Sequence, residues 1–198
     1  MKLLGTITLT QIQRDRLKIG EKPNQIYQPN PLFAVDAVQL TPHGIIGKTA
    51  DGGYLVDAHH ANHPNTRHNS HNGISIAFTF LYNEMKNRFG DTATLGIAGE
   101  NIIIDDAGNF DVNTIKDGAT IVIESSTNGE KTTLTVGKGI PPCRPFTRYL
   151  TKNDELDGDE LEDHLQFLSN GMRGFYVYLD NPAETPTIQA GDKVYFVE

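Results

Sequence analysis

Short apolar runs with alternating or β-branched positions recur along the whole chain, and this pattern predicts strands. Residues 100–105 place Ile102 and Ile104 on the same side of one such run. Asn128-Gly129 lies between two further runs and is typical of a hairpin turn. The segments expected to form strands are residues 2–12, 32–40, 100–105, 119–125, 131–137, 173–180 and 192–198. Many short strands separated by turn residues indicate a mostly β fold, either a barrel or a sandwich.

Two stretches follow the period of an α-helix instead. In residues 78–90, apolar side chains recur at i, i+3, i+4, i+7 and i+11, and a glycine follows. In residues 160–171, three leucines form a stripe that ends at an Asn-Gly pair. Neither helix lies in a repeating strand–helix–strand pattern, so a doubly wound sheet is not expected. Residues 20–31, 41–72 and 151–160 are expected to be loops, and the length of the second points to a functional role.

Composition and charge restrict the class of protein. The chain has 198 residues, of which 37% are hydrophobic, and we expect a single domain over residues 1–198. Its formal net charge is −8, whereas proteins that bind nucleic acid or anionic membranes normally present a basic face. We therefore expect neither kind of partner. One cysteine cannot form an internal disulfide and no apolar window reaches the length of a membrane span, so we expect a cytoplasmic protein.

The only cysteine, Cys143, lies in the sequence Gly-Ile-Pro-Pro-Cys-Arg-Pro-Phe at residues 139–146. Three prolines restrict the backbone around it, Arg144 beside it favours the thiolate, and Lys138 adds positive charge nearby in sequence. A lone cysteine is often a small buried apolar residue. A thiolate on a stiff loop beside cations instead suits a nucleophile, a sulfur carrier or a ligand for a soft metal.

Histidines concentrate in residues 57–72, which hold five of the seven in the chain. His59 and His63 have the i, i+4 spacing of two zinc ligands on one helical turn. Pro64 argues against a helix there, and Asp57 is the only nearby carboxylate. The segment is therefore either a polar loop or the site of a zinc-dependent hydrolase or lyase.

Two further patterns are weaker. Residues 73–77, Gly-Ile-Ser-Ile-Ala, resemble a nucleophile elbow without its last glycine, and we expect Ser75 to lie in a strand that leads into the first helix. The acidic run at residues 154–163 lacks the bidentate glutamate of a calcium loop, and we expect a solvated loop leading into the second helix.

Five motifs in one order resemble a known family, the MOSC domain, which is the C-terminal module of molybdenum cofactor sulfurase. They are LGIAGENIIID at 95–105, IKDGATIVI at 115–123, PPCRPF at 141–146, GMRGFYVYL at 171–179 and AGDKVYF at 190–196. The resemblance covers residues 40–197, and residues 1–39 are expected to add N-terminal strands to the barrel. It implies a β-barrel with peripheral helices, in which Cys143 faces a pocket.

The resemblance also implies a cofactor and a set of contacts. Cys143 either carries sulfur destined for the molybdenum cofactor or ligates molybdenum directly, as a soft thiolate can. Asn101 of the Gly-Glu-Asn motif is a candidate to hydrogen-bond the pterin ring, although this motif could equally be a turn that starts a strand. The candidates to hold the pterin phosphate are Arg144, Arg173, Lys138 and Arg67.

The chain departs from the family pattern in places. The aspartate that usually follows the glycine of the second motif is replaced by Ala119, and the Gly-Asp-x-His motif of the first half is stretched between Gly47 and His59. The pyridoxal phosphate domain of fused sulfurases is absent from this sequence, so we expect a stand-alone form that depends on a separate sulfur donor or redox partner protein. The leading hypothesis is therefore a sulfur carrier or a small molybdenum-dependent reductase of an N- or S-containing substrate. The alternatives are the zinc enzyme and a non-catalytic protein-binding module.

Overall fold

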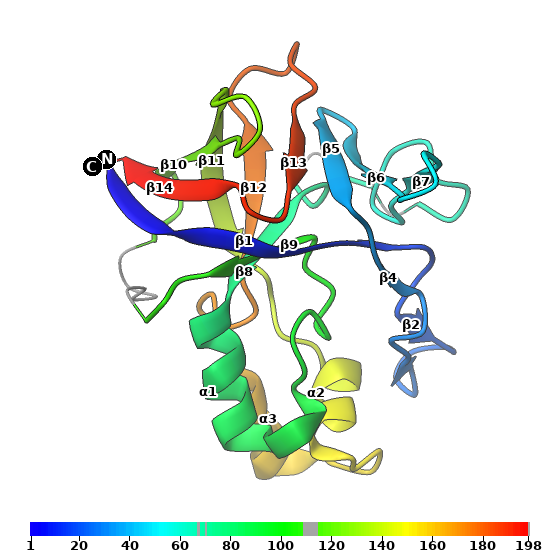
Figure 1. Ribbon diagram of the computed structural model, residues 1–198. Coiled ribbons are helices and arrows are strands. Elements are labelled where there is room, and N and C mark those ends of the chain that lie inside the picture. Colours follow the sequence, from blue (N-terminus) through cyan, green and yellow to red (C-terminus); the bar gives the residue numbers. More distant parts are fainter. Residues whose placement is uncertain (67, 70, 109–114, 198) are drawn as a thin grey trace.

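A closed ring of strands forms the centre of the molecule in the computed structural model, which describes residues 1–66, 68–69, 71–108 and 115–197 (Figure 1). The ring strands are β1 (Lys2–Gln13), β8 (Ser75–Phe78), β9 (Ile102–Asp105), β10 (Thr120–Glu124), β11 (Lys131–Gly139), β12 (Phe175–Leu179) and β14 (Lys193–Val197). They pair in the order β14-β10-β11-β12-β8-β9-β1, and the β1–β14 pair closes the ring. The predicted mostly β fold, with a β-barrel, is therefore confirmed.

Strand β1 reaches three partners because it is long and irregular. It pairs with β14 at its start, with β9 in its middle and with β4 (Leu32–Ala34) at its end, and its register shifts twice on the way. Gly5 lies at one of these shifts, where a Cβ atom would stand 2.1 Å from the carbonyl oxygen of Asp105. The absence of a side chain at this position lets β9 approach the bulge.

A smaller sheet and a short hairpin flank the barrel. The sheet has the order β13-β5-β6-β7, and β2 pairs only with β3 among the described strands. Their bounds are β2 (Lys18–Ile19), β3 (Ile26–Tyr27), β5 (Ala37–Thr41), β6 (Gly44–Lys48), β7 (Tyr54–Val56) and β13 (Thr187–Gln189). Two predictions are corrected here. The single strand expected at 32–40 is divided between β4 and β5, and the loop expected at 41–72 contains β6 and β7.

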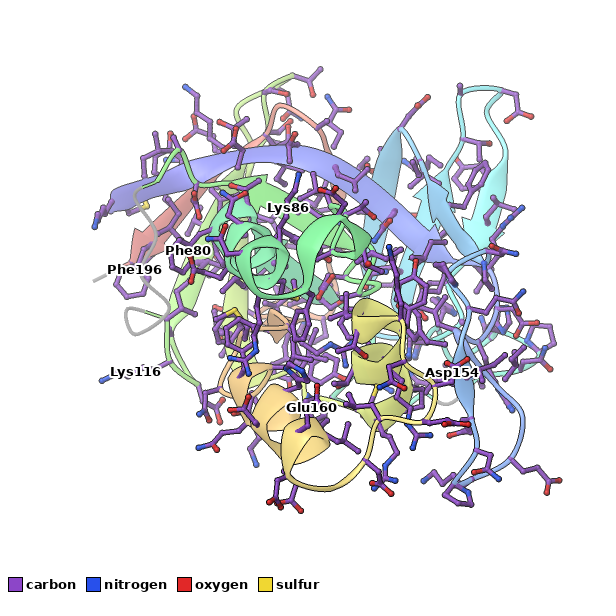
Figure 2. All side chains as sticks on the ribbon, turned by 90° about the horizontal axis from the view of Figure 1, so that it is seen from below. Phe80, Lys86, Lys116, Asp154, Glu160 and Phe196 are labelled. Carbon is purple, nitrogen blue, oxygen red and sulfur yellow. The ribbon has the colours of Figure 1, made fainter. Side chains whose placement is uncertain are left out.

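The helices lie together at one end of the barrel, at the bottom of Figure 1. They are α1 (Thr79–Phe89), followed by a short 3-10 turn (Gly90–Thr92), α2 (Arg144–Thr151) and α3 (Gly158–Phe167). Seen from below, exposed Asp154 of the acidic run lies beside α2, and exposed Glu160 lies on α3 (Figure 2). Within the described residues, no helix is both long and apolar enough to cross a membrane.

Helix α2 was not predicted from the sequence. Cys143 is its N-cap residue, and Pro145 lies in its first turn, where a missing N–H breaks no intrahelical bond. The segment 139–146, expected to be a rigid loop, is therefore a short extended stretch followed by a helix start. Phe146 and Leu150 on this helix are fully buried, so packing of its apolar face on the core stabilises a helix of only eight residues.

The turn before β14 depends on a buried carboxylate. Asp192 is fully buried, and its Oδ1 accepts hydrogen bonds from the backbone N–H of Ser126 at 2.8 Å and from the Ser126 hydroxyl at 2.9 Å. Its Oδ2 accepts one from the backbone N–H of Gln189 at 2.9 Å. The Gly-Asp motif thus fixes the entry of the strand that closes the barrel.

Replacing this carboxylate should weaken the barrel closure. Asp192→Ala is expected to lower the free energy of unfolding by about 2 to 4 kcal/mol, because three hydrogen bonds to a buried charged acceptor are lost. Urea denaturation would measure it, with the exposed Asp154→Ala as the control, for which a change within about 0.5 kcal/mol is expected. An effect of Asp192→Ala no larger than that of the control would contradict this role.

Candidate functional site

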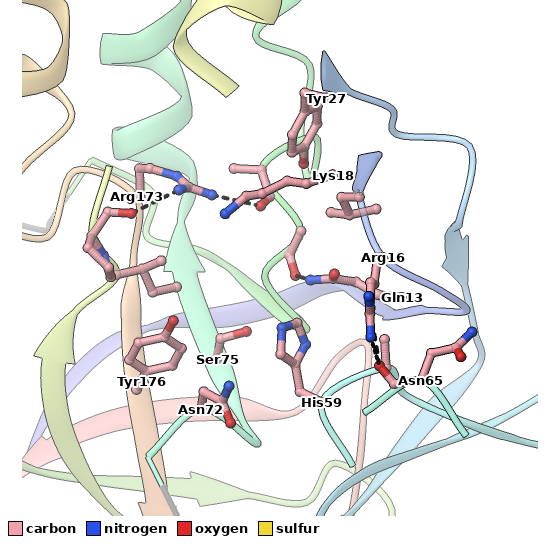
Figure 3. A pocket seen from close by; sticks show the side chains of 16 residues that line it. Gln13, Arg16, Lys18, Tyr27, His59, Asn65, Asn72, Ser75, Arg173 and Tyr176 are labelled. Atoms are coloured by element: carbon pink, nitrogen blue, oxygen red, sulfur yellow. Dashed lines mark hydrogen bonds between the residues drawn. The ribbon is translucent and has the colours of Figure 1, made fainter. Parts of the chain in front are cut away.

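A cleft of about 190 Å³ opens at the barrel end between segments that are far apart in sequence. Its walls come from residues 13–18, the turn at Ala58 and His59, Ser75 of β8, residues 98–99, residues 140–141 and the start of β12 (Figure 3). Arg173 and Tyr176 contribute side chains to one wall and Arg16 to the other side, and the side chain of Lys18 extends toward Arg173. The cleft therefore collects side chains from both halves of the chain.

Arg173 brings its positive charge next to the only thiol. Its side chain is 6% exposed, and Nη1 donates to the carbonyl oxygen of Pro141 at 3.0 Å and lies 3.7 Å from Sγ of Cys143. Nη2 donates to the carbonyl oxygen of Ala98 at 3.1 Å, and the guanidinium lies 4.5 Å from the ring centre of Phe146. Among the described residues, no carboxylate forms an ion pair with Arg173, and its buried Nε has no hydrogen-bond partner. A buried cation in this state can accept an anionic neighbour.

Cys143 lies beside the cleft wall. It is half-buried and is not itself among the residues that line the cleft, whereas Arg173, which lies beside its sulfur, and Pro141, two positions earlier in the chain, do line it. Its carbonyl oxygen accepts hydrogen bonds from the backbone N–H and the hydroxyl of Thr147, both at 3.1 Å. These bonds belong to the first turn of α2, so the helix start fixes the position of the thiol.

A buried carboxyl group lies on the inner side of the site. Glu100 is 1% exposed, its Oε2 accepts a hydrogen bond from the Tyr82 hydroxyl, and its Oε1 has no hydrogen-bond partner in the described chain. Burial raises the pKa of Glu100, and the positive charge of Arg173 opposes that rise only in part. The same burial, together with the nearby Glu100 charge, raises the pKa of Tyr82. The network therefore favours a neutral carboxyl over a second buried charge.

A second network joins the histidine turn to the barrel. Asp57 is fully buried; its Oδ2 accepts hydrogen bonds from the backbone N–H of Gln13 at 2.7 Å and from Nδ2 of Asn101 at 3.0 Å. Its Oδ1 accepts one from the backbone N–H of His59 at 2.8 Å and lies 3.2 Å from Nδ1 of that ring. Oδ1 of Asn101 accepts a hydrogen bond from the Ser75 hydroxyl at 2.8 Å. Asn101, predicted to contact a pterin ring, thus has its amide occupied by the protein itself.

His59 is held with one ring nitrogen toward Asp57 and its ring at the cleft (Figure 3). A proton on Nδ1 directed at the carboxylate leaves Nε2 as the nitrogen that can accept a proton or a hydrogen bond from a ligand. His63, the other predicted zinc ligand, does not line the cleft. Its Nε2 lies 3.1 Å from the carbonyl oxygen of Arg14, and its Nδ1 accepts a hydrogen bond from the backbone N–H of Asn65 at 3.1 Å.

Three or more His, Cys, Asp or Glu side chains placed to hold a metal ion are not found anywhere in the described ranges. Buried His60 is also engaged by the protein, since its Nδ1 accepts a hydrogen bond from the backbone N–H of Asn62 at 3.1 Å. Burial lowers the pKa of His60, and the positive charge that His43 can carry lowers it further. This histidine is therefore kept neutral.

The predicted phosphate-binding cations are dispersed. Nη1 of Arg144 forms an ion pair at 3.2 Å with Oδ1 of Asp157, and Lys138 is exposed on β11. Neither lines the cleft. Arg67 lies outside the described residues. Of the described members of this set, only Arg173 reaches the cleft wall.

The sequence reading missed other residues that build the site. Arg16 and Lys18 line the cleft, and Asp57 orients His59. The one available signal for the first two was the cluster of basic residues at 14–18, within a segment that no family motif includes. The link from Asp57 to Asn101 spans 44 positions, so it could not be read from local spacing.

Glu100→Gln should change how stability depends on pH. Because the pKa of Glu100 is raised above its ordinary value of 4.5, the folded protein holds this proton more tightly than the unfolded chain does. As pH rises from 4.5 through the raised pKa, the wild type should therefore lose stability relative to Glu100→Gln, and the difference should then stay constant.

Urea unfolding of both proteins at about pH 4 and about pH 8 would measure this difference. Glu162→Gln, which changes an exposed carboxylate on α3, is the matched control and should show no such dependence. An equal gap between wild type and Glu100→Gln at both pH values would contradict the raised pKa.

Comparison with known proteins agrees with this architecture. The model of the MOSC domain matches residues 68–195, which is more than half of the chain. No curated protein sequence gives a significant match. Among solved structures, the chain is similar to the YUAD protein from Bacillus subtilis, with a TM-score of 0.54 and 15% identity over 96% of both chains. It is also similar to a protein described as hypothetical, with a TM-score of 0.52 and 12% identity over 100% of this chain and 69% of the other.

At such identities the likeness to the solved structures concerns the fold alone. The family assignment depends instead on the sequence match, which includes the Gly-Glu-Asn, Pro-Pro-Cys, Arg-Gly and closing Gly-Asp motifs in their predicted order. The predicted resemblance is thereby confirmed, and the chain belongs to the MOSC domain family.

Proposed function

We propose that this protein binds the molybdenum cofactor and that Cys143 either holds its molybdenum as a thiolate or carries sulfur for it. The observation that carries the proposal is the position of the buried Arg173 guanidinium, with Nη1 3.7 Å from the Cys143 sulfur at the wall of the cleft. A cation there stabilises sulfur in an anionic state, which is the state needed for metal ligation and for nucleophilic attack.

The residues present fit an anionic group with a soft centre. Arg16, Lys18 and Arg173 line the cleft, and among its described lining residues none is Asp or Glu. The buried Nε of Arg173 has no hydrogen-bond partner in the described chain, so the hydrogen-bonding capacity of this guanidinium is not fully used. When bound, the cofactor supplies a metal centre that exchanges two electrons and an oxygen atom with a substrate.

Each side chain at the cleft has its own proposed role in binding or proton transfer. Cys143 supplies the sulfur, and Arg173 holds an opposite charge beside it. Asp57 orients His59 so that Nε2 can give or take a proton at an atom bound in the cleft. Because burial raises the pKa of Glu100, its charged form is disfavoured, and it forms no ion pair that would compete with the sulfur for Arg173.

As a carrier, the Cys143 thiolate attacks the outer sulfur of a donor protein's persulfide. A new S–S bond forms on Cys143 while the S–S bond of the donor breaks, and the donor sulfur leaves as a thiolate with the electron pair of that bond. As a metal ligand, the same thiolate stays bound and a separate redox partner supplies electrons. Either use needs a free thiol, so we propose the reducing cytoplasm as the working compartment.

Molybdenum content tests the proposal. Protein purified without oxygen from a host that makes the cofactor should contain close to one molybdenum atom per chain. Cys143→Ser should lose it if the sulfur is the metal ligand, because the hydroxyl group of serine is a hard donor that does not replace a soft thiolate. Elemental analysis by mass spectrometry gives the result, and zinc in place of molybdenum would instead support the histidine alternative.

Arg173→Gln should weaken cofactor retention by about 10- to 100-fold, as loss of a group that supports a metal ligand commonly does. Arg173→Lys keeps the charge and should recover part of the retention. Circular dichroism and urea unfolding of each variant separate this effect from misfolding. Full retention in a folded Arg173→Gln protein would overturn the assigned role of the guanidinium.

If Cys143→Ser keeps its molybdenum, the sulfur carrier remains, and intact-protein mass spectrometry after incubation with a persulfide donor decides. The wild type should gain the mass of one sulfur atom, and Cys143→Ser should not. Retention of molybdenum together with no sulfur uptake by the wild type would exclude both uses of the thiol.

A further inference from the structure

Two buried side-chain atoms of the described residues have no hydrogen-bond partner, and they are complementary. One is Oε1 of Glu100, which is an acceptor, and the other is Nε of Arg173, which is a donor. Both side chains are almost fully buried, yet they form no ion pair with each other. Folded proteins seldom leave such atoms unpaired, so these two residues have a capacity for interaction that the observed state does not use.

A chain of hydrogen bonds connects the two side chains. Nη2 of Arg173 donates to the carbonyl oxygen of Ala98 at 3.1 Å, and the backbone N–H of Ala98 donates to the hydroxyl oxygen of Tyr82 at 3.3 Å. The Tyr82 hydroxyl group in turn donates to Oε2 of Glu100. Because residues 98 and 100 are two positions apart, one short segment holds both the carboxyl group and a carbonyl oxygen that anchors the guanidinium.

Arg173 has two neighbours that can carry a negative charge. They are the Cys143 sulfur, which lies 3.7 Å from Nη1, and the carboxyl group of Glu100. Burial alone would lower the pKa of Arg173, but negative charge at Cys143 and at Glu100 raises it. One buried cation balances one negative charge, and a second anion in the same enclosure would be buried without a counter-charge. Charge on one of the two groups therefore disfavours charge on the other.

The other titratable groups around Glu100 keep their charge state at neutral pH. Burial raises the pKa of each neighbouring tyrosine, so the hydroxyl groups stay protonated. Lys18 extends toward Arg173 from β2, but it is exposed and its charge is screened by solvent (Figure 3). Of these described neighbours, only the sulfur and the carboxyl group change their charge near neutral pH. The tyrosines that interact with Glu100 are Tyr27 on β3, Tyr82 on α1 and Tyr176 on β12.

We propose that Glu100 and the Cys143 sulfur alternate as the counter-charge of Arg173. When the sulfur is a thiolate, Glu100 holds a proton. When the sulfur is neutral, Glu100 releases this proton to solvent and its carboxylate balances the guanidinium. Glu100 is thus a charge-balancing residue, and it allows a thiolate to form and to react while Arg173 always has one negative neighbour.

This proposal rests on the proposed function only in that Cys143 works as a thiolate. Two substitutions at this position set the charge beside Arg173 without the use of a thiol. Cys143 is the N-cap residue of α2, and serine and aspartate are both favourable N-cap residues, so Cys143→Ser and Cys143→Asp should keep the start of the helix. At neutral pH the serine side chain is neutral and the aspartate side chain is negative.

The protonation of Glu100 in the two variants tests the coupling. NMR of protein with carbon-13 in the glutamate carboxyl groups follows each carboxyl group as pH changes, and the Glu100 signal is the one that Glu100→Gln lacks. Glu100 should bind its proton about tenfold more tightly in Cys143→Asp than in Cys143→Ser, because a negative charge a few ångströms away opposes a second one. Exposed Glu162 on α3 is the internal control and should titrate identically in both.

The wild-type chain provides a second measurement that involves no substitution. Methyl methanethiosulfonate converts the Cys143 thiolate to a methyl disulfide, in which a new S–S bond forms and methanesulfinate leaves with the electron pair of the bond that breaks. The sulfur becomes neutral, so Glu100 should titrate in the modified wild type as it does in Cys143→Ser. Equal titration of Glu100 in Cys143→Ser and Cys143→Asp, or no change on modification of the wild type, would overturn the coupling.

These titrations need no cofactor, so their outcome is separate from that of the proposed function. If the wild type contains no molybdenum and takes up no sulfur, but Glu100 responds to the charge at residue 143, the proposed function fails and the coupling is supported. If the wild type contains molybdenum and Glu100 does not respond, the coupling alone is overturned.

Discussion

The burial of one guanidinium group constrains the arrangement of the barrel end. Arg173 is almost fully enclosed, and an isolated charge in such a place costs several kcal/mol unless its donors are used and its charge is balanced. Two backbone carbonyl groups, the face of Phe146 and the sulfur of Cys143 surround it. Residues 98, 141, 143 and 146 therefore surround the guanidinium. The start of helix α2 contributes two of them, Cys143 and Phe146.

The buried carboxylate of Asp57 also holds separate segments together, on the other side of the cleft. Its two oxygens bind the end of β1, the Gly-Glu-Asn segment that leads into the neighbouring strand β9, and the histidine turn, which belongs to no strand. Asn101 extends the network to Ser75 on β8. Such a fully satisfied polar network specifies one geometry, because each partner that left it would remain buried without a hydrogen bond. The position of His59 at the cleft is a consequence of this network.

The sequence predicted those parts of the fold that depend on local pattern. Alternation in 119–125 and 131–137 and the Asn128-Gly129 turn were enough to predict the hairpin of β10 and β11, in which Glu124 faces Lys131. The α1 helix, with Leu81, Tyr82 and Met85 buried, followed from its period. Helix α2 was missed although Phe146, Tyr149 and Leu150 recur at i, i+3 and i+4, because it has only eight residues and three prolines lie at and before its start.

The candidate site was predictable only where motif order supplied tertiary information. Cys143 and Arg173 are 30 positions apart, and the family resemblance assigned both to one cofactor without predicting that they contact each other. Arg144, adjacent to the thiol in sequence, is turned to Asp157 by the helix start, because successive residues of a helix point in different directions. Closeness in sequence therefore suggested Arg144 as the cation beside the sulfur, whereas the packing of distant segments places Arg173 there.

The distribution of charge links stability to selectivity. Near the sulfur, Glu100 is the buried acid that could neutralise Arg173, yet it forms no ion pair with it and its pKa is raised. A direct ion pair would lower the cost of burying the guanidinium, but it would also cancel the positive charge felt at Cys143. Burial raises the pKa of Glu100 and disfavours its charged form, whereas the hydrogen bond from Tyr82 favours that form, and the guanidinium of Arg173 is left with the Cys143 sulfur as a neighbour. The guanidinium of Arg173 is therefore buried without an ion pair among the described residues. This arrangement is less stabilising for the core, but its positive charge remains able to bind an anion.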